Sequence, residues 1–139
     1  MKKTLIHSLT FPPDTISTGM IVSEIADGLN KELNNIEVLV SSPQYNLKSA
    51  QEYNQNDKNI SVGMFKGIKV HYIESNPRQF SNSSRFFQWL GFNFKAIRFI
   101  YKNRKNYKEI LIFSYPPTMN LVCIFTSKIL KINTIYSLW

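Results

Sequence analysis

The sequence has little cysteine and no long apolar run, and each shortage excludes a class of protein. Cys123 is the only cysteine among 139 residues, so neither an intrachain disulfide nor a cysteine-rich metal site can form within the chain. A single thiol favours a reducing, cytoplasmic location. No apolar stretch approaches the roughly 20 residues of a transmembrane helix. The apolar start Thr4–Leu9 is interrupted by His7 and Ser8 and lacks the small-residue cleavage site of a signal peptide.

Acidic side chains are scarce in the second half of the chain. From Ser75 onward, ten lysines and arginines accompany a single acid, Glu109, which gives this half a charge of +9. The residues up to Glu74 carry −1, so the net charge of +8 lies wholly in the second half. This asymmetry points to a polyanionic partner, either nucleic acid or an anionic membrane surface.

The residues that are present favour one packed domain spanning residues 1–139. Hydrophobic residues make up 43% of the chain and aromatic residues 14%, enough for a core. Strands are expected at Thr4–Thr10, Ile36–Val40, Gly67–Ile73, Glu109–Phe113 and Ile132–Tyr136, and helices at Met20–Leu33, Ser84–Tyr107 and Pro117–Leu130. This alternation predicts a Rossmann-like α/β fold, with a mostly parallel sheet and helices on both faces. The polar stretch Gln44–Lys66 predicts a long functional loop.

Three segments are predicted to share one edge of this sheet. Phe11–Gly19, Ser41–Asn46 and Ser114–Thr118 each follow a strand, and open parallel sheets bind ligands beyond the carboxyl ends of their strands. Gly19 opens a helix, where backbone N–H groups can approach a phosphate, although an ordinary helix-start glycine is the alternative. The segment is neither a dinucleotide-binding fingerprint nor a P-loop.

Short motifs follow successive strands in a definite order. They read Phe11-Pro12-Pro13-Asp14, Ser17-Thr18-Gly19, Glu24-Ile25-Ala26-Asp27-Gly28-Leu29, Ser42-Pro43-Gln44-Tyr45-Asn46, Ser114-Tyr115-Pro116-Pro117-Thr118 and Ile135-Tyr136-Ser137-Leu138-Trp139. Together they cover the whole chain, and in this order they resemble the N-terminal half of family 4 retaining glycosyltransferases of the GT-B fold.

The resemblance implies a two-domain enzyme that moves a sugar from a nucleotide-sugar to an acceptor glycan, often lipid-linked, in cell-surface polysaccharide synthesis. The nucleotide-sugar is a co-substrate, and neither a metal nor another cofactor is implied. In this family the N-terminal domain chiefly binds the acceptor, and its first loop approaches the donor phosphates. Gly19 matches that loop's glycine, while Asp14, Tyr45 and Tyr115 are candidates for acceptor-side contacts.

The second, donor-binding domain that the resemblance implies has no counterpart in this chain. The family pattern is interrupted at Trp139, so the chain alone is expected to lack transferase activity, and no catalytic residue is assigned. His7 is expected to be a satisfied core histidine within the first strand. His71 is expected to lack the cysteine or acidic partner that a metal site requires.

A long basic and aromatic helix spans Ser84–Lys105. One apolar stripe is predicted to cover the sheet: Phe86, Leu90, Phe94, Ile97 and Tyr101. A second edge combines aromatic and cationic residues: Phe92, Lys95, Arg98, Phe99 and Lys102. Such an edge is typical of helices that lie on anionic membranes, which predicts peripheral association with the inner face of the plasma membrane. A core helix with a solvated basic edge is the alternative.

Two other functions remain open at this point. The chain could be a non-catalytic membrane-docking subunit, or a remnant, that needs a separate donor-binding chain. Nucleic-acid binding through the basic half is disfavoured, because the aromatic residues lie mostly on the stripe expected to face the core and no recognised binding motif is present.

Overall fold

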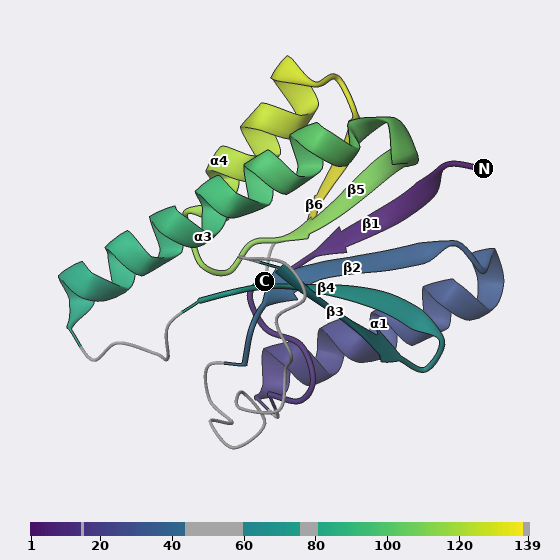
Figure 1. The fold of residues 1–139 in the computed structure, drawn as a ribbon, viewed down its shortest axis with the longest axis horizontal. Helices are drawn as coiled ribbons and strands as arrows, with labels where there is room; N and C mark the ends of the chain where they lie inside the picture. Colours follow the sequence, from purple (N-terminus) through teal and green to yellow (C-terminus); the bar gives the residue numbers. More distant parts are fainter. Residues whose placement is uncertain (15, 44–59, 76–80, 138–139) are drawn as a thin grey trace.

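The computed structural model describes residues 1–14, 16–43, 60–75 and 81–137. Its strands are β1 (Lys3–His7), β2 (Ile36–Ser41), β3 (Ile60–Phe65), β4 (Ile68–Ile73), β5 (Tyr107–Phe113) and β6 (Asn133–Ser137). Its helices are α1 (Ser17–Leu33), α3 (Asn82–Asn103), the 3-10 turn η1 (Arg104–Asn106), α4 (Met119–Ile124) and the wider π turn η2 (Phe125–Ile129). The predicted Rossmann-like α/β fold is confirmed: a mostly parallel sheet lies between helices on its two faces (Figure 1).

The sheet has six strands in the order β3-β4-β2-β1-β5-β6. Every neighbouring pair is parallel except β3 and β4, which are antiparallel. From β1 the chain first builds the β2 and β4 side of the sheet and then returns to build β5 and β6 on the other side. The strand order therefore reverses between β1 and β5. In open α/β sheets, ligands bind at the carboxyl ends of the strands beside such a reversal.

One strand was not predicted. Ile60–Phe65 was expected to belong to a long loop, and it forms β3 instead, paired with β4 through a tight turn. The turn residues Lys66 and Gly67 have positive φ angles of 47° and 79°, as a two-residue hairpin turn requires. The alternation of apolar residues before this Lys-Gly pair was the sequence feature that indicated a strand. The rest of the predicted loop, residues 44–59, lies outside the described part.

Two core clusters fill the two faces of the sheet. Helix α1 covers one face, and α3 and α4 lie side by side over the other (Figure 1). The α1 face buries Ile6, Val22, Ala26, Val38, Val40, Ile68, Val70 and Tyr72, among others. The opposite face buries Leu5, Leu39, Phe92, Ala96, Phe99, Ile100, Ile110 and Ile112, among others. Successive strand residues point to opposite faces, so β1, β2, β4 and β5 supply both clusters.

Helix α3 turns a different side to the sheet from the one expected. Its buried residues are Phe92, Asn93, Ala96, Phe99 and Ile100, so the prediction that the Phe86–Tyr101 stripe covers the sheet is wrong. The short side chain of Ala96 lies between two rings that pack on the sheet. Phe92 stacks on the ring of His7 at 5.4 Å, and Phe99 lies 4.8 Å from the ring of His71. Both sides of α3 carry aromatics, so hydrophobicity alone could not select the buried one.

The first turns of α3 extend past the end of the sheet (Figure 1). This position leaves Phe86 and Phe87 with exposed fractions of 47% and 69%. None of the helices in the described ranges combines the length and apolar character that crossing a membrane demands.

Candidate functional site

The described parts of the three predicted segments lie at the carboxyl edge of the sheet. The turn after β1 is fixed by the Tyr72 hydroxyl, which donates to the carbonyl of Pro12 at 2.9 Å. Ser42, just after β2, donates through its Oγ to the carbonyl of Ser75 at 3.1 Å. After β5, the N–H of Ser114 donates to the carbonyl of Ser137 at 3.0 Å. Hydrogen bonds thus tie the end of β4 to the segments after β1 and β2, and the end of β6 to the segment after β5.

Gly19 lies in the first turn of α1, where a side chain would meet the preceding loop. A Cβ atom built there would lie 3.3 Å from both the backbone N of Phe11 and the carbonyl oxygen of Asp14. The loop therefore packs directly on the helix start, which is a sufficient structural reason for glycine. The donor-phosphate role of Gly19 remains a prediction.

The three acceptor-side candidates differ in accessibility. Asp14 is only 2% exposed and lies in the turn packed on α1. Tyr115 is 40% exposed in the β5–α4 loop, and its ring meets that of Trp89 edge-on at 5.9 Å. Tyr45 lies outside the described residues. Tyr115 is thus the accessible candidate at this edge.

His7 lies fully buried at the last position of β1. Its Nδ1 is 2.9 Å from the carbonyl oxygen of Leu39, so this nitrogen carries the proton. Burial lowers the pKa of His7 to about 4 even though the bond to Leu39 opposes the shift, so the ring is neutral at pH 7. Its Nε2 is then an acceptor, and it has no hydrogen-bond partner in the described part of the chain. The prediction of a core histidine is confirmed, but only one nitrogen is satisfied.

Other buried polar atoms near the β1–β5 reversal also have no partner within the described ranges. They are Ser8 Oγ, Thr10 Oγ1, both amide atoms of Asn93, and Thr118 Oγ1. One turn of α3 joins this set: Phe92 stacks on His7, and Trp89 contacts Tyr115 in the loop that contains Thr118. Asn93 is 1% exposed and belongs to the same turn. Unpaired buried polar groups are uncommon and can mark a ligand site.

Sequence reasoning missed Asn93 and Trp89. The signal was an amide between two phenylalanines, one turn after a tryptophan, but it has meaning only once the buried side of α3 is known.

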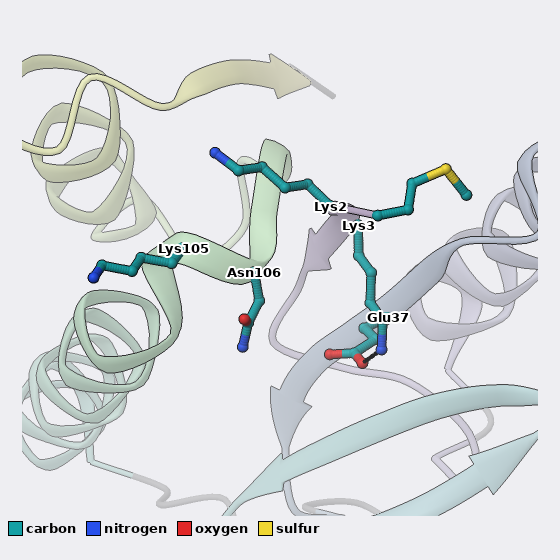
Figure 2. A pocket seen from close by; sticks show the side chains of 6 residues that line it. Lys2, Lys3, Glu37, Lys105 and Asn106 are labelled. Carbon is teal, nitrogen blue, oxygen red and sulfur yellow. Dashed lines mark hydrogen bonds and ion pairs between the residues drawn. The ribbon is translucent and has the colours of Figure 1, made fainter.

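A second polar group lies under α3, nearer the amino ends of the strands. The carboxylate of Glu37 accepts a hydrogen bond from the Tyr107 hydroxyl at 2.8 Å, and it pairs with His71 Nε2 at 3.1 Å and with Lys3. Figure 2 shows Lys3 turned toward Glu37. The expectation that His71 has no acidic partner was wrong, because Glu37 comes from the neighbouring strand β2 and not from nearby sequence.

The environment sets the charge of each member of this group. Burial would raise the pKa of Glu37, but the bonds from Lys3, Tyr107 and His71 outweigh it and lower the pKa to about 2. Burial lowers the pKa of His71 despite the neighbouring carboxylate, and burial together with Glu37 raises that of Tyr107. The resulting group is a carboxylate held by an ammonium, a neutral imidazole and a phenol. No cluster of three or more potential metal ligands occurs among the described residues.

The membrane-facing prediction for α3 is wrong at its two aromatic positions. Phe92 and Phe99 are 2% and 8% exposed, because the sheet covers them. The three cations do lie outside the core: Arg98 and Lys102 are exposed, and Lys95 donates to the carbonyl of Glu74 at 2.9 Å. The aromatic residues that α3 exposes are Phe86, Phe87, Phe94 and Tyr101.

The carboxyl edge is thus a partly accessible surface above buried polar atoms at the β1–β5 reversal. Comparison with known proteins adds no assignment: no family model matches the sequence, and the search of curated proteins produced no match.

Proposed function

We propose that this chain forms the N-terminal, acceptor-side domain of a glycosyltransferase that uses a nucleotide-sugar donor. The observation that carries the proposal is the set of buried polar atoms without described partners beside the β1–β5 reversal. A sugar acceptor presents many hydroxyl groups that can pair with such atoms. His7 and Asn93 are 0% and 1% exposed, so contact with them requires this edge of the sheet to open on binding. The order of the short motifs along the chain supports the same proposed function.

In this proposal, the neighbouring residues have separate roles. Tyr115 and Trp89 offer aromatic surface next to the polar set, a combination suited to a sugar ring with one apolar face. Asn93 and His7 provide hydrogen-bonding capacity beneath it. The N–H groups at the start of α1 approach the donor phosphates, and the remaining donor contacts belong to the second domain that the resemblance implies.

The test is a titration of the 15N-labelled chain, followed by NMR. The probes are the methyl glycosides of glucose, galactose and N-acetylglucosamine, and separately UDP-glucose. Sugar binding should shift the amide signals of Ser8–Thr10 and of Ser114, Tyr115, Thr118 and Met119. UDP-glucose should shift those of Ser17–Gly19. Absence of shifts at these segments with every probe at millimolar concentration would contradict the proposal.

Asn93→Leu separates a binding role from a packing role. If the amide is unpaired in the free protein, an apolar side chain of similar size should leave stability unchanged or raise it by about 1 kcal/mol. The same change should weaken glycoside binding by about fivefold or more, since one hydrogen bond is lost. Asn120→Leu, at an exposed position of α4, is the matched control and should leave binding unchanged.

A second candidate function is docking on an anionic membrane. The observation that favours it is the exposed apolar surface of the α3–α4 layer: Phe86, Phe87, Phe94, Tyr101, Leu121, Ile124 and Ile129. Arg98 and Lys102 are exposed on the same layer. Aromatic and aliphatic side chains bordered by cations are typical of surfaces that bind at the lipid interface.

Co-sedimentation with vesicles tests this second function. Binding should require phosphatidylglycerol in the phosphatidylcholine vesicles, and Phe87→Ser with Phe94→Ser should weaken it about tenfold. Met64→Ser removes an equally exposed apolar side chain from β3 and serves as the control. Equal binding of both variants to the vesicles would exclude the α3–α4 layer as the docking surface.

A further inference from the structure

Two adjoining surface depressions lie at the amino-terminal edge of the sheet, opposite the carboxyl edge. Their volumes are about 480 and 360 Å³, and both are lined by Lys2 and Lys105. The fold brings their cations together from three distant segments: the start of β1, the η1–β5 junction and the turn before β6. They are Lys2, Lys3, Arg104, Lys105, Lys108 and Lys131.

Two of these six cations already have partners. Lys3 pairs with Glu37, the one acid that lines either depression. Arg104 donates to the carbonyl of Tyr101 at 2.6 Å and lies 4.4 Å from the centre of its ring. The other four, Lys2, Lys105, Lys108 and Lys131, make no ion pair with any residue in the described ranges. We call these four lysines the basic edge.

Ordinary structural needs do not account for the basic edge. Cations near a helix C-terminus are stabilised by the helix dipole, which suits Lys105 just after α3 and Lys131 just after η2. Lys2 and Lys108 lie at the starts of strands, where no such dipole acts. Figure 2 shows Lys2 and Lys105 extending to the same side of β1, away from Glu37. Like charges gathered in this way repel one another and destabilise the folded chain, and a bound anion would remove that cost.

The backbone beneath the basic edge is anchored. The carbonyl of Lys2 accepts a hydrogen bond from the Asn35 amide at 2.6 Å. Lys131 occupies a left-handed turn with φ of 54°, and the next N–H, that of Ile132, donates to the carbonyl of Thr126 at 3.0 Å. Flexible ammonium groups are therefore mounted on fixed positions around a depression, an arrangement that suits a compact anion with several charges.

We propose that the basic edge is a binding site for a phosphate-bearing anion. The ligand is a compact, multiply charged phosphate group, carried by a soluble molecule or by a lipid headgroup. Lysine ammonium groups bind phosphate oxygens as point charges. The site lies at the opposite edge of the sheet from the acceptor-side residues, so it does not depend on the glycosyltransferase proposal.

The first test measures the thermal unfolding temperature in inorganic pyrophosphate, against sodium chloride of equal ionic strength. A ligand that binds only the folded state raises this temperature in a saturable way. Lys105→Gln with Lys131→Gln should weaken the apparent affinity by about 25-fold, since each cation contributes about fivefold. Lys31→Gln with Lys66→Gln removes the same charge from exposed positions on α1 and the β3–β4 turn, outside both depressions. This control should change the apparent affinity less than about twofold.

A second arm distinguishes the source of the phosphate. It measures binding of the same variants to phosphatidylcholine vesicles with and without phosphatidic acid, whose headgroup is a phosphomonoester. If pyrophosphate raises the unfolding temperature and the Lys105 and Lys131 substitutions abolish that rise, the ligand is a soluble phosphate. If pyrophosphate gives no protection and only the Lys105 and Lys131 variant loses binding to phosphatidic acid, the ligand is a lipid headgroup. If neither probe binds, or if both double variants lose binding equally, the basic edge is not a phosphate site.

Discussion

The two faces of the sheet are built with different chemistry, although the same strands supply both. The strand residues under α1 are mainly aliphatic, such as Val38, Val40 and Val70. The face under α3 buries His7, His71 and Glu37 among its apolar residues. An aliphatic face needs only shape and water exclusion. A face with buried titratable groups must also satisfy hydrogen bonds and charge, so its stability should depend on individual atoms and on pH.

The largest expected effect comes from removing the charge at the centre of the polar face. Glu37→Gln should lower the free energy of unfolding by about 3 kcal/mol, because Tyr107 and His71 lose a charged acceptor and Lys3 loses its counter-ion. Chemical denaturation at pH 7 measures this directly.

The adjacent residue provides the matched control on the other face. Val38 is fully buried toward α1, so Val38→Thr places a hydroxyl in the aliphatic face at an expected cost of about 2 kcal/mol. The two substitutions are almost isosteric and opposite in polarity, and both should destabilise. If Glu37→Gln costs less than about 1 kcal/mol, the polar group contributes little and the contrast between the faces fails.

A change of pH should alter the stability contributed by the polar face and leave that of the aliphatic face unchanged. The folded-state pKa of His7 is lowered from 6.5 to about 4, so between these pH values the unfolded chain binds a proton that the folded chain does not. Stability should therefore fall as the pH falls, by about 2 kcal/mol between pH 7 and pH 5 from His7 alone. His71 shifts in the same direction, whereas Glu37 acts mainly below its ordinary pKa of 4.5.

His7→Leu tests the assignment of this slope. The variant removes the titrating group and keeps an apolar side chain against Phe92, so its loss of stability between pH 7 and pH 5 should be about 2 kcal/mol smaller than that of the unmodified chain. Denaturation curves at the two pH values provide the comparison. Identical slopes for the two proteins would show that His7 is not protected from protonation in the folded state.

The contrast between the faces also explains what the sequence could predict. The α1 side follows simple rules: Val22 and Ala26 lie one turn apart and face aliphatic strands, so helix α1 and strands β1, β2, β4 and β5 were predicted close to their observed positions. The carboxyl-edge segments followed from strand direction alone. Local pattern was sufficient because these strands are short runs buried mostly on both faces, and because helix α1 has a single buried side.

The α3 side could not be predicted in the same way. Its buried stripe includes Asn93 and excludes Phe94, because the helix packs where Ala96 allows close approach and where two histidine rings meet Phe92 and Phe99. The partners of those contacts come from strands far away in the sequence. Likewise, the pairing of Glu37 with His71 and the convergence of the basic edge depend on strand register and chain order, which no local pattern encodes.

The smallest expected effect compares two glycines of α1, the helix on the aliphatic face. At Gly28 no atom lies within 4 Å of an added Cβ, so Gly28→Ala should stabilise the chain by about 1 kcal/mol through helix propensity. At Gly19 the same methyl group meets Phe11 and Asp14 backbone atoms at 3.3 Å, so the propensity gain should be offset by displacement of the loop. Gly19→Ala should therefore leave stability unchanged or lower it by about 1 kcal/mol, as thermal unfolding can measure. Equal stabilisation by both substitutions would mean that the loop yields easily, and packing would then no longer explain a glycine at position 19.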